Sequence, residues 1–371
     1  MSRPVWAEIS RSAIAHNVRE LKRKTQMGAR LMAVVKADGY GHGALEVSRV
    51  ALEAGAEYLG VATLDEAVAL RDAGINAPIL ILGHTPDDDL AKVIAHDITQ
   101  TVYSLTGAQA VAAAARKVGR TARIHLKVDS GMSRLGFFPT EDSIALVKQI
   151  VSLSGLQVEG IFTHFATADE VDKSYAWEQF ARFKWFIKRL EDEGLMIPLK
   201  HAANSAAIID LPETHLDMVR AGIALYGLYP SANQRSKIDL QPAMSLKTRV
   251  VFLKEVPAGT AISYGRTYIT PVPTRVATLP IGYADGYSRR LSNRAAVLIH
   301  GRRAPVIGRV CMDQCLIDVG QIPRVAVGDE VVLFGEQKGA KLPVDELAEI
   351  LETINYEVVC LITARVRREY L

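Results

Sequence analysis

Eight short β-type segments alternate with amphipathic helical patterns between residue 31 and about residue 225. The segments are 31–36, 57–61, 78–83, 99–103, 122–129, 157–164, 199–203 and 217–221. Strands that alternate with helices are typical of βα units and a parallel sheet, and eight is the number that closes a barrel. The sequence therefore predicts an α/β fold whose first part is a (β/α)8 barrel of the TIM type.

The pattern changes after about residue 240. Runs such as "SLKTRVVFLKEV", "TRVATLPIG", "RAAVLIHG" and "DEVVLFG" recur with Gly and Pro turns and few helical periods. Such spacing is typical of an all-β module. We therefore expect a barrel domain over residues 1–240 and a mainly β C-terminal domain over residues 241–371. The first dozen residues contain an isolated strand, which we expect to pair with the β domain.

Composition excludes several classes of partner. The 44 basic and 41 acidic residues are mixed along the chain, with no basic arm of the nucleic-acid-binding kind. The three cysteines have no CxxC or metal-ligand spacing, which fits reduced thiols in a cytosol. No signal peptide and no apolar stretch of membrane-spanning length is visible. We expect a soluble cytoplasmic protein with no metal, no nucleic-acid partner and no membrane partner.

The segment "LMAVVKADGYGHG" ends the first predicted strand on Lys36. In a βα barrel, chemistry gathers at the C-terminal ends of the strands. An amine that loses hydration beside apolar neighbours has a lowered pKa, and its nucleophilic fraction suits Schiff-base formation. From position alone, a lysine that extends from a strand end into water remains an equal alternative.

Polar residues also stand at four other predicted strand ends. The alternative for each one is a hydrogen-bonded polar residue of the core, but five such ends on one barrel mouth favour a common site. Barrels often hold a phosphate after the last strand, where Gly222 and Ile223 lie. An amine, a cation and a phosphate site together describe a pyridoxal phosphate site. The residues at these ends are His125, Lys127, Asp129, His164, Asn204, Ser205 and Arg220.

At these positions the sequence resembles the alanine racemase family. The matching motifs follow the family's order over nearly the whole chain: "VVKADGYGHG", "HLKVDSGMSRLG", "THFATAD", "HAANSAA", "VRAGIALYG", "SYGRTY", "GYADGYSR", "CMDQ" and "INYEV". The resemblance implies an isomerase that interconverts L- and D-alanine with pyridoxal 5'-phosphate. Such an enzyme supplies D-alanine for peptidoglycan or feeds alanine catabolism.

The resemblance implies two catalytic bases on opposite faces of the cofactor. Lys36 holds the cofactor and serves D-alanine, and Tyr264 in the β domain serves L-alanine. Racemisation needs such a pair, because one group removes the α-proton and another delivers a proton to the other face. As in the family, we expect the two bases of one site to come from different subunits of a head-to-tail homodimer with composite active sites.

The remaining roles also rest on the resemblance. Arg220 is similar to the residue that contacts the pyridine nitrogen, and a guanidinium leaves that nitrogen an unprotonated acceptor. His164 supports Arg220, and Lys127 matches a lysine that is often carbamylated in the family. The substrate carboxylate clamp is Arg134 with the amide of Met312. The phosphate set is Tyr40, Ser205, Gly222, Ile223 and Tyr356, with Asn204 beside it; Tyr356 and Tyr264 narrow the entrance, and Asp169, Arg289 and Arg309 line the outer channel.

Three other readings share parts of this pattern. A noncatalytic pyridoxal phosphate-binding protein on the same barrel would not need the β domain. A pyridoxal phosphate amino-acid decarboxylase of the same fold would place an acidic residue where Arg220 stands. A cofactor-free Schiff-base aldolase would not need the phosphate set.

Overall fold

The computed structural model describes residues 3–371, and contacts divide the chain into two compact units. The barrel unit comprises Ala13–Gly39 and Ala44–Gln241. The β unit comprises the N-terminal residues up to Ser12, the segment Tyr40–Gly43, and Pro242–Leu371. Among the described helices, none combines the length and the apolar character needed to cross a membrane.

The barrel unit contains an eight-stranded parallel sheet in the order β8-β7-β6-β5-β4-β3-β2-β9, counted over the described residues. Two backbone hydrogen bonds, from Asp217 N to Lys200 O and from Arg220 N to Ala203 O, join the outer strands and close the barrel. The predicted barrel is therefore confirmed. Its strands are β2 (Arg30–Val34), β3 (Tyr58–Val61), β4 (Ile79–Ile81), β5 (Thr99–Val102), β6 (Ala122–Lys127), β7 (Leu156–Phe162), β8 (Leu199–His201) and β9 (Met218–Ala221).

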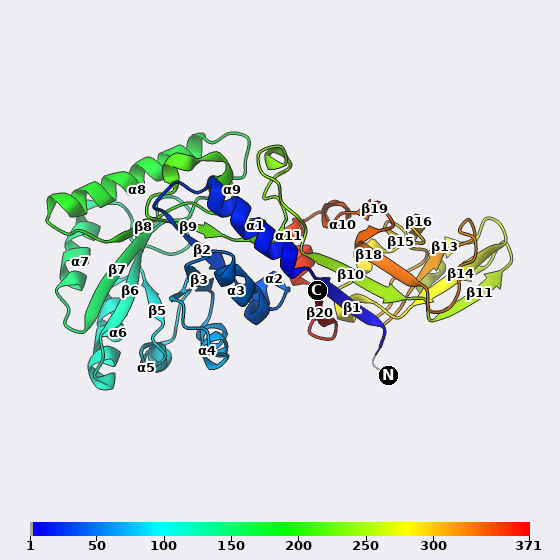
Figure 1. Cartoon of the computed structure of the whole chain (residues 1–371), viewed down its shortest axis with the longest axis horizontal. Helices are drawn as coiled ribbons and strands as arrows, with labels where there is room; N and C mark the ends of the chain where they lie inside the picture. The colour runs from blue at the N-terminus through cyan, green and yellow to red at the C-terminus, as the bar shows by residue number, and fades with distance from the viewer. Residues whose placement is uncertain (1–2) are drawn as a thin grey trace. The chain divides into compact units, whose positions relative to one another are not determined.

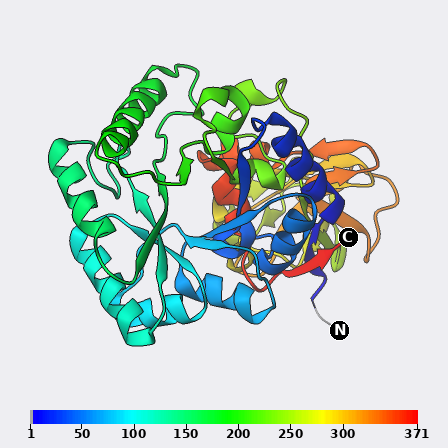
Figure 2. The same ribbon diagram turned by 60° about the vertical axis from the view of Figure 1, so that its left-hand side comes forward.

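Helices surround these strands because each presents one apolar face to the sheet (Figures 1 and 2). In the longest, α8 (Ser174–Asp192), the phenylalanines Phe180, Phe183 and Phe186 are buried. The other helices assigned to this part of the chain are α1 (Arg11–Lys24), which begins in the β unit, α3 (Ala44–Glu53), α4 (Leu64–Asp72), α5 (Leu90–Ala95), α6 (Leu105–Val118), α7 (Glu141–Val151) and α9 (Ser205–Asp210); short 3-10 turns are η1 (Asp87–Asp89), η2 (Pro212–Thr214), η3 (Ile223–Tyr226) and η4 (Ala232–Gln234).

The segment labelled α2 (Lys36–Tyr40) in Figure 1 is a single left-handed turn. Ala37, Asp38 and Gly39 have φ angles of 53°, 51° and 61°, and Tyr40 follows at 51°. The expected strand over 31–36 is therefore too long: β2 ends at Val34, and Lys36 lies two residues beyond it. A left-handed conformation costs a non-glycine residue about 1–2 kcal/mol. Hydrogen bonds from the Ala37 amide to Glu66 Oε1 and from the Ala44 amide to Asp38 Oδ1 hold this part of the chain in place.

The β unit is built around the N-terminal strand β1 (Val5–Ile9). This strand pairs antiparallel with β10 (Met244–Arg249) and parallel with β20 (Arg367–Tyr370). The sheet order is β16-β15-β18-β10-β1-β20, with β19 on β18. The other strands are β11 (Phe252–Val256), β12 (Ala261–Ile262), β13 (Tyr268–Ile269), β14 (Thr274–Leu279), β15 (Ala296–Ile299), β16 (Arg302–Pro305), β17 (Cys315–Asp318), β18 (Glu330–Gln337) and β19 (Ala340–Leu342); the helical segments are η5 (Tyr264–Arg266), η6 (Tyr283–Asp285), η7 (Arg289–Leu291), α10 (Val344–Leu351) and α11 (Asn355–Cys360).

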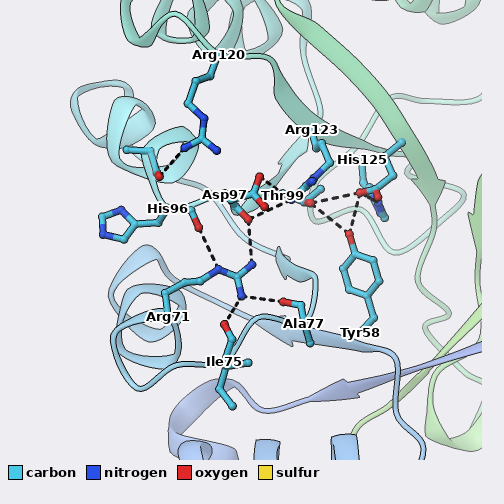
Figure 3. A network of polar contacts seen from close by, with 12 residues as sticks. Tyr58, Arg71, Ile75, Ala77, His96, Asp97, Thr99, Arg120, Arg123 and His125 are labelled. Carbon is cyan, nitrogen blue, oxygen red and sulfur yellow. Dashed lines mark hydrogen bonds and ion pairs between the residues drawn. The ribbon is translucent and has the colours of Figure 1, made fainter.

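Arg71 of α4 ties together the segments that precede β4 and β5 (Figure 3). Its guanidinium donates to the backbone oxygens of Ile75, Ala77, His96 and Asp97 over distances of 2.6–3.0 Å. The planar, five-donor guanidinium can make four such bonds at once, whereas an ammonium group cannot.

We expect Arg71→Lys to lower the free energy of unfolding by about 2 kcal/mol, because carbonyl oxygens lose charged donors. Urea denaturation followed by circular dichroism measures this change. Arg120→Lys is the matched control, since the exposed Arg120 side chain donates to a single described carbonyl oxygen, that of Ala95. Equal effects of the two variants would contradict the role given to Arg71.

Candidate active site at the strand ends of the barrel

Arg220 on β9 is a buried cation, only 4% exposed. Its Nη2 donates to Thr163 O at 2.7 Å and to Ala202 O at 2.9 Å. Its Nη1 lies 3.0 Å from His201 Nδ1, and its Nη2 lies 3.2 Å from His164 Nδ1. All these partners are neutral acceptors. Burial, together with the charge of Arg134, lowers the pKa of Arg220 to about 9, which still leaves the guanidinium charged at neutral pH.

The Nε of Arg220 makes no hydrogen bond to any described residue, so this donor is left for a ligand. A guanidinium has only donors, and a ligand at this position therefore has to present an acceptor. Arg220 also lies over the face of Phe162, with 5.4 Å between the guanidinium carbon and the ring centroid.

His164, two residues beyond the end of β7, lies among the predicted cationic residues. Burial lowers the pKa of His164 well below its ordinary value, and the positive charges of four neighbours lower it further. The imidazole is therefore neutral, and its Nδ1 can accept from Arg220. The four neighbours are Arg220, Lys127, Arg134 and Lys36, so the structure brings these predicted site residues together. Such a cluster of positive charge favours an anionic ligand.

Lys127 ends β6 and is buried. Its Nζ has no hydrogen-bond partner among the described residues and lies 4.8 Å from the centroid of the Phe162 ring. Burial, with the charges of Arg220 and Arg134, lowers the pKa of Lys127 well below its ordinary value. These surroundings disfavour the charged ammonium form of Lys127.

Arg134 stands on a loop that Asp129 shapes. The Asp129 carboxylate accepts the amides of Gly131 and Ser133 at 3.0 and 2.9 Å. The loop then returns to the barrel, where the Phe137 amide donates to Lys127 O. Arg134 itself is exposed. Asp129, which alternates with Lys127 in the sequence, therefore holds the backbone between the buried strand β6 and Arg134.

Two backbone amides after β9 converge on one point. Gly222 N and Ala224 N donate to Ser205 Oγ at 2.8 and 3.3 Å. Amides that converge in this way form a nest that suits an anionic oxygen. Asn204 Oδ1 caps α9 by accepting from the Ala207 amide, and Ile223 is fully buried in η3. Ser205, Gly222 and Ile223 therefore lie together, as the phosphate set requires.

In the β unit, Tyr40 and Tyr356 lie together, with their ring centroids 6.3 Å apart. A Cβ on Gly41 would lie 2.4 Å from Val359 O, so only glycine lets the segment after Tyr40 pack this closely on α11. Burial raises the pKa of the Tyr40 phenol, which keeps it protonated as a donor.

Tyr264 projects from the turn η5 and is 71% exposed. The turn is fastened to the segment around Arg309, because Ser263 Oγ donates to Arg309 O at 2.6 Å. The same serine lies 3.5 Å from the sulfur of Cys311, next to Met312. Tyr264, Arg309 and Met312 thus stand on two segments in contact.

Asp169 in the barrel unit and Arg289 in the β unit are exposed. Within its own unit, neither side chain has a described hydrogen bond or ion pair with another predicted site residue. Their assignment to an entrance channel stays a prediction.

Two residues of the network around Arg220 were not among the predicted site residues. His201 ends the short strand β8, and Glu159 lies inside β7. The available signals were a histidine in an apolar run and a charged residue next to a glycine, which is typical of a β-bulge. Among the described residues, no group of three or more His, Cys, Asp or Glu side chains is placed to hold a metal ion.

Family models and related proteins that match this chain carry the same family name, and together they cover its whole length. Residues 9–230 match the family model described as alanine racemase, N-terminal domain, and residues 243–370 match the one described as alanine racemase, C-terminal domain. Proteins named alanine racemase from Methanococcus maripaludis and Desulforamulus reducens are 53% and 54% identical, each over 100% of both chains.

Solved structures give the same result. Alanine racemase from Clostridium difficile 630 superposes with a TM-score of 0.96 at 43% identity, covering 100% of this chain and 96% of that one. Alanine racemase from Bacillus anthracis with bound L-Ala-P superposes with a TM-score of 0.94 at 40% identity and the same coverage. With both family models matched and relatives more than half identical along its full length, the chain belongs to the alanine racemase family.

Proposed function

We propose that this protein is an isomerase that interconverts L- and D-alanine with pyridoxal 5'-phosphate as cofactor. When bound, the cofactor supplies an electron-accepting ring that stabilises negative charge at Cα of an amino acid held through its nitrogen. The observation that carries the proposal is the cluster of Lys36, Arg134 and Arg220 around neutral His164, in a chain related to alanine racemases along its whole length.

The residues fit this cofactor. Arg220 offers Nε as a donor, which suits an unprotonated ring nitrogen. The converging amides beside Ser205 suit a phosphate oxygen, and the paired rings of Tyr40 and Tyr356 supply further hydroxyl groups. In this assignment Lys36 holds the cofactor, with Gly222, Ile223 and Asn204 completing the phosphate set.

The chain's own work in the reaction is proton transfer at Cα of alanine. Lys36 Nζ takes or gives the proton on the D-alanine side, and Tyr264 Oη does so on the opposite face for L-alanine. Two groups are needed because a single base returns the proton to the face from which it came. A decarboxylase of this fold is disfavoured, because Arg220 and its neutral partners stand where an acidic residue is expected.

The exposure of Tyr264 supports assembly with a second copy. A phenol that transfers protons works best where water is excluded. Ile269 and Val272, close to Tyr264 in sequence, are also more than half exposed, and so is Met312. A head-to-tail homodimer would cover these side chains and combine Lys36 of one subunit with the Tyr264 phenol of its partner. Tyr264 and Tyr356 would then narrow the entrance, with Asp169, Arg289 and Arg309 along the outer channel.

Arg134 binds the substrate carboxylate directly, and Lys127 acts on it indirectly by orienting Arg134. Arg134, with the Met312 amide, clamps it. In its unprotonated form, which burial favours, the amine of Lys127 attacks carbon dioxide, forms an N–C bond and releases a proton to solvent. The resulting carbamate carries a negative charge that orients the Arg134 guanidinium.

The biological setting is also part of the proposal. The reaction would supply D-alanine for peptidoglycan, or in the reverse direction it would feed alanine catabolism. Cys311, Cys315 and Cys360 form no disulfide, which suits a reducing compartment and supports a cytoplasmic location.

The first test concerns the cofactor. Purified protein with pyridoxal phosphate should show an absorption band near the boundary between the ultraviolet and visible ranges. Borohydride reduction should abolish that band and leave the cofactor attached to the peptide that contains Lys36. Lys36→Met should lack the band because the reactive amine is gone. Lys188→Met, which removes an exposed lysine on α8, should retain it. A colourless wild-type protein would favour the aldolase reading.

The second test separates the two bases. Tyr264→Phe should keep the cofactor band but lose about 100-fold or more in racemisation, the usual contribution of one acid–base group. In deuterium oxide it should exchange the α-hydrogen of D-alanine much faster than that of L-alanine. Tyr103→Phe, at a half-buried tyrosine of the barrel unit, should behave as wild type. Full turnover of L-alanine by Tyr264→Phe would remove Tyr264 from its role.

The third test concerns Lys127. Protein equilibrated with 13C-labelled bicarbonate should show a carbamate carbon resonance that is absent from Lys127→Met. The resonance should weaken at low pH, where protonation of the amine and loss of carbon dioxide reverse the reaction. A wild-type spectrum identical to that of the variant would show that Lys127 stays unmodified.

A further inference from the structure

A chain of four buried or partly buried side chains runs through the interior of the barrel from Arg220 to Glu159. Arg220 Nη1 lies 3.0 Å from His201 Nδ1, His201 Nε2 lies 2.9 Å from His125 Nδ1, and His125 Nε2 lies 3.3 Å from Glu159 Oε2. Both histidines are completely buried. The chain joins the cation at the strand ends to a carboxylate near the beginnings of other strands.

The chemistry of its two ends fixes every proton along this chain. Arg220 can only donate, so His201 Nδ1 has to be the acceptor and His201 Nε2 carries the hydrogen. His125 Nδ1 then accepts, and His125 Nε2 donates to Glu159, which can only accept when ionised. Burial lowers the pKa of both histidines below the ordinary value, so each ring is neutral and holds one proton. Every contact then pairs one donor with one acceptor.

The ionised state of Glu159 is secured by its surroundings. Burial favours the protonated form, but hydrogen bonds from His125 and Tyr58 and the charge of Arg123 outweigh it and lower the pKa of Glu159. Tyr58 Oη donates to Glu159 Oε2 at 2.8 Å, and Thr99 Oγ1 donates to the same oxygen at 3.3 Å. Figure 3 shows Tyr58, Thr99, Arg123 and His125 gathered at this end of the chain.

The backbone is adapted to this contact. The pairing of β6 with β7 passes from Ile124↔Val158 to His125↔Gly160, so Glu159 is the extra residue of a β-bulge. A bulge redirects a side chain that a regular strand would point elsewhere. A Cβ on Gly160 would lie 2.6–2.8 Å from three atoms of the His125 ring. The extra residue and the following glycine together give the imidazole its place beside the carboxylate.

We propose that Glu159 is a positioning residue for Arg220. Through His125 and His201, it fixes which nitrogen of each imidazole carries the proton, so that Arg220 always meets a lone pair and keeps one orientation toward its ligand. The effect on catalysis rests on the proposed function, whereas the ordering of the protons does not.

The positions of the protons on His125 and His201 can be tested in the wild-type protein without an activity measurement. Two-bond 15N–1H spectra of protein labelled with 15N-histidine distinguish the tautomers, and single histidine variants assign the signals. Both His125 and His201 should carry hydrogen on Nε2 and none on Nδ1. A hydrogen on Nδ1 of His201 would overturn the proposal.

Glu159→Gln tests the consequence. A carboxamide both accepts and donates, so it permits the reversed chain, in which His201 Nδ1–H faces Arg220 Nη1–H. The variant should show a mixture of histidine tautomers, a shifted absorption band of bound pyridoxal phosphate, and a kcat lowered roughly tenfold for the loss of one hydrogen bond, with the KM for alanine unchanged.

Tyr58→Phe is the matched control, because it removes another hydrogen bond to Glu159 but leaves the chain intact. It should lower thermal stability while tautomers, band and kcat remain as in wild type. Single tautomers and unchanged kcat in Glu159→Gln, or equal effects in both variants, would overturn the proposal. Absence of racemisation by the wild-type protein would instead overturn the proposed function, and the tautomers would remain measurable.

Discussion

A guanidinium that leaves water has to regain its hydrogen bonds within the protein, because an uncompensated buried charge costs several kcal/mol. Arg220 regains them from two backbone carbonyls and two imidazoles. None of these partners neutralises its charge, so the positive potential persists at the strand ends. Burial lowers the pKa of His164 and of Lys127, and the same positive potential lowers both further.

This electrostatic arrangement explains why several different side chains serve one site. Cations attract the phosphate and carboxylate groups of the proposed ligands, and imidazoles that stay neutral remain available as hydrogen-bond acceptors. The barrel supplies rigid strand ends for these groups. The β unit carries Tyr264, the proposed second base, on a tight turn where it is highly exposed.

Much of the architecture could be predicted from the sequence, because alternating strand and helix patterns are local signals. All eight barrel strands occur near their predicted positions, and Lys127 does end its strand, whereas His164, like Lys36, lies two residues beyond the end of its own. The roles proposed for Lys36, Tyr264 and the other site residues stay predictions. His201 and Glu159 escaped notice because their importance comes from contacts between strands distant in sequence. The early end of β2 escaped notice because a left-handed turn has no reliable signature in residues such as Ala37 and Asp38.

The left-handed turn after Lys36 also constrains how this segment can evolve. Substitution at Ala37 and Asp38 is governed by backbone preference more than by side-chain size. Glycine, asparagine and aspartate enter the left-handed region with least penalty, and valine or isoleucine with most. Few residue types are therefore tolerated at these two positions, even though neither side chain takes part in the proposed reaction.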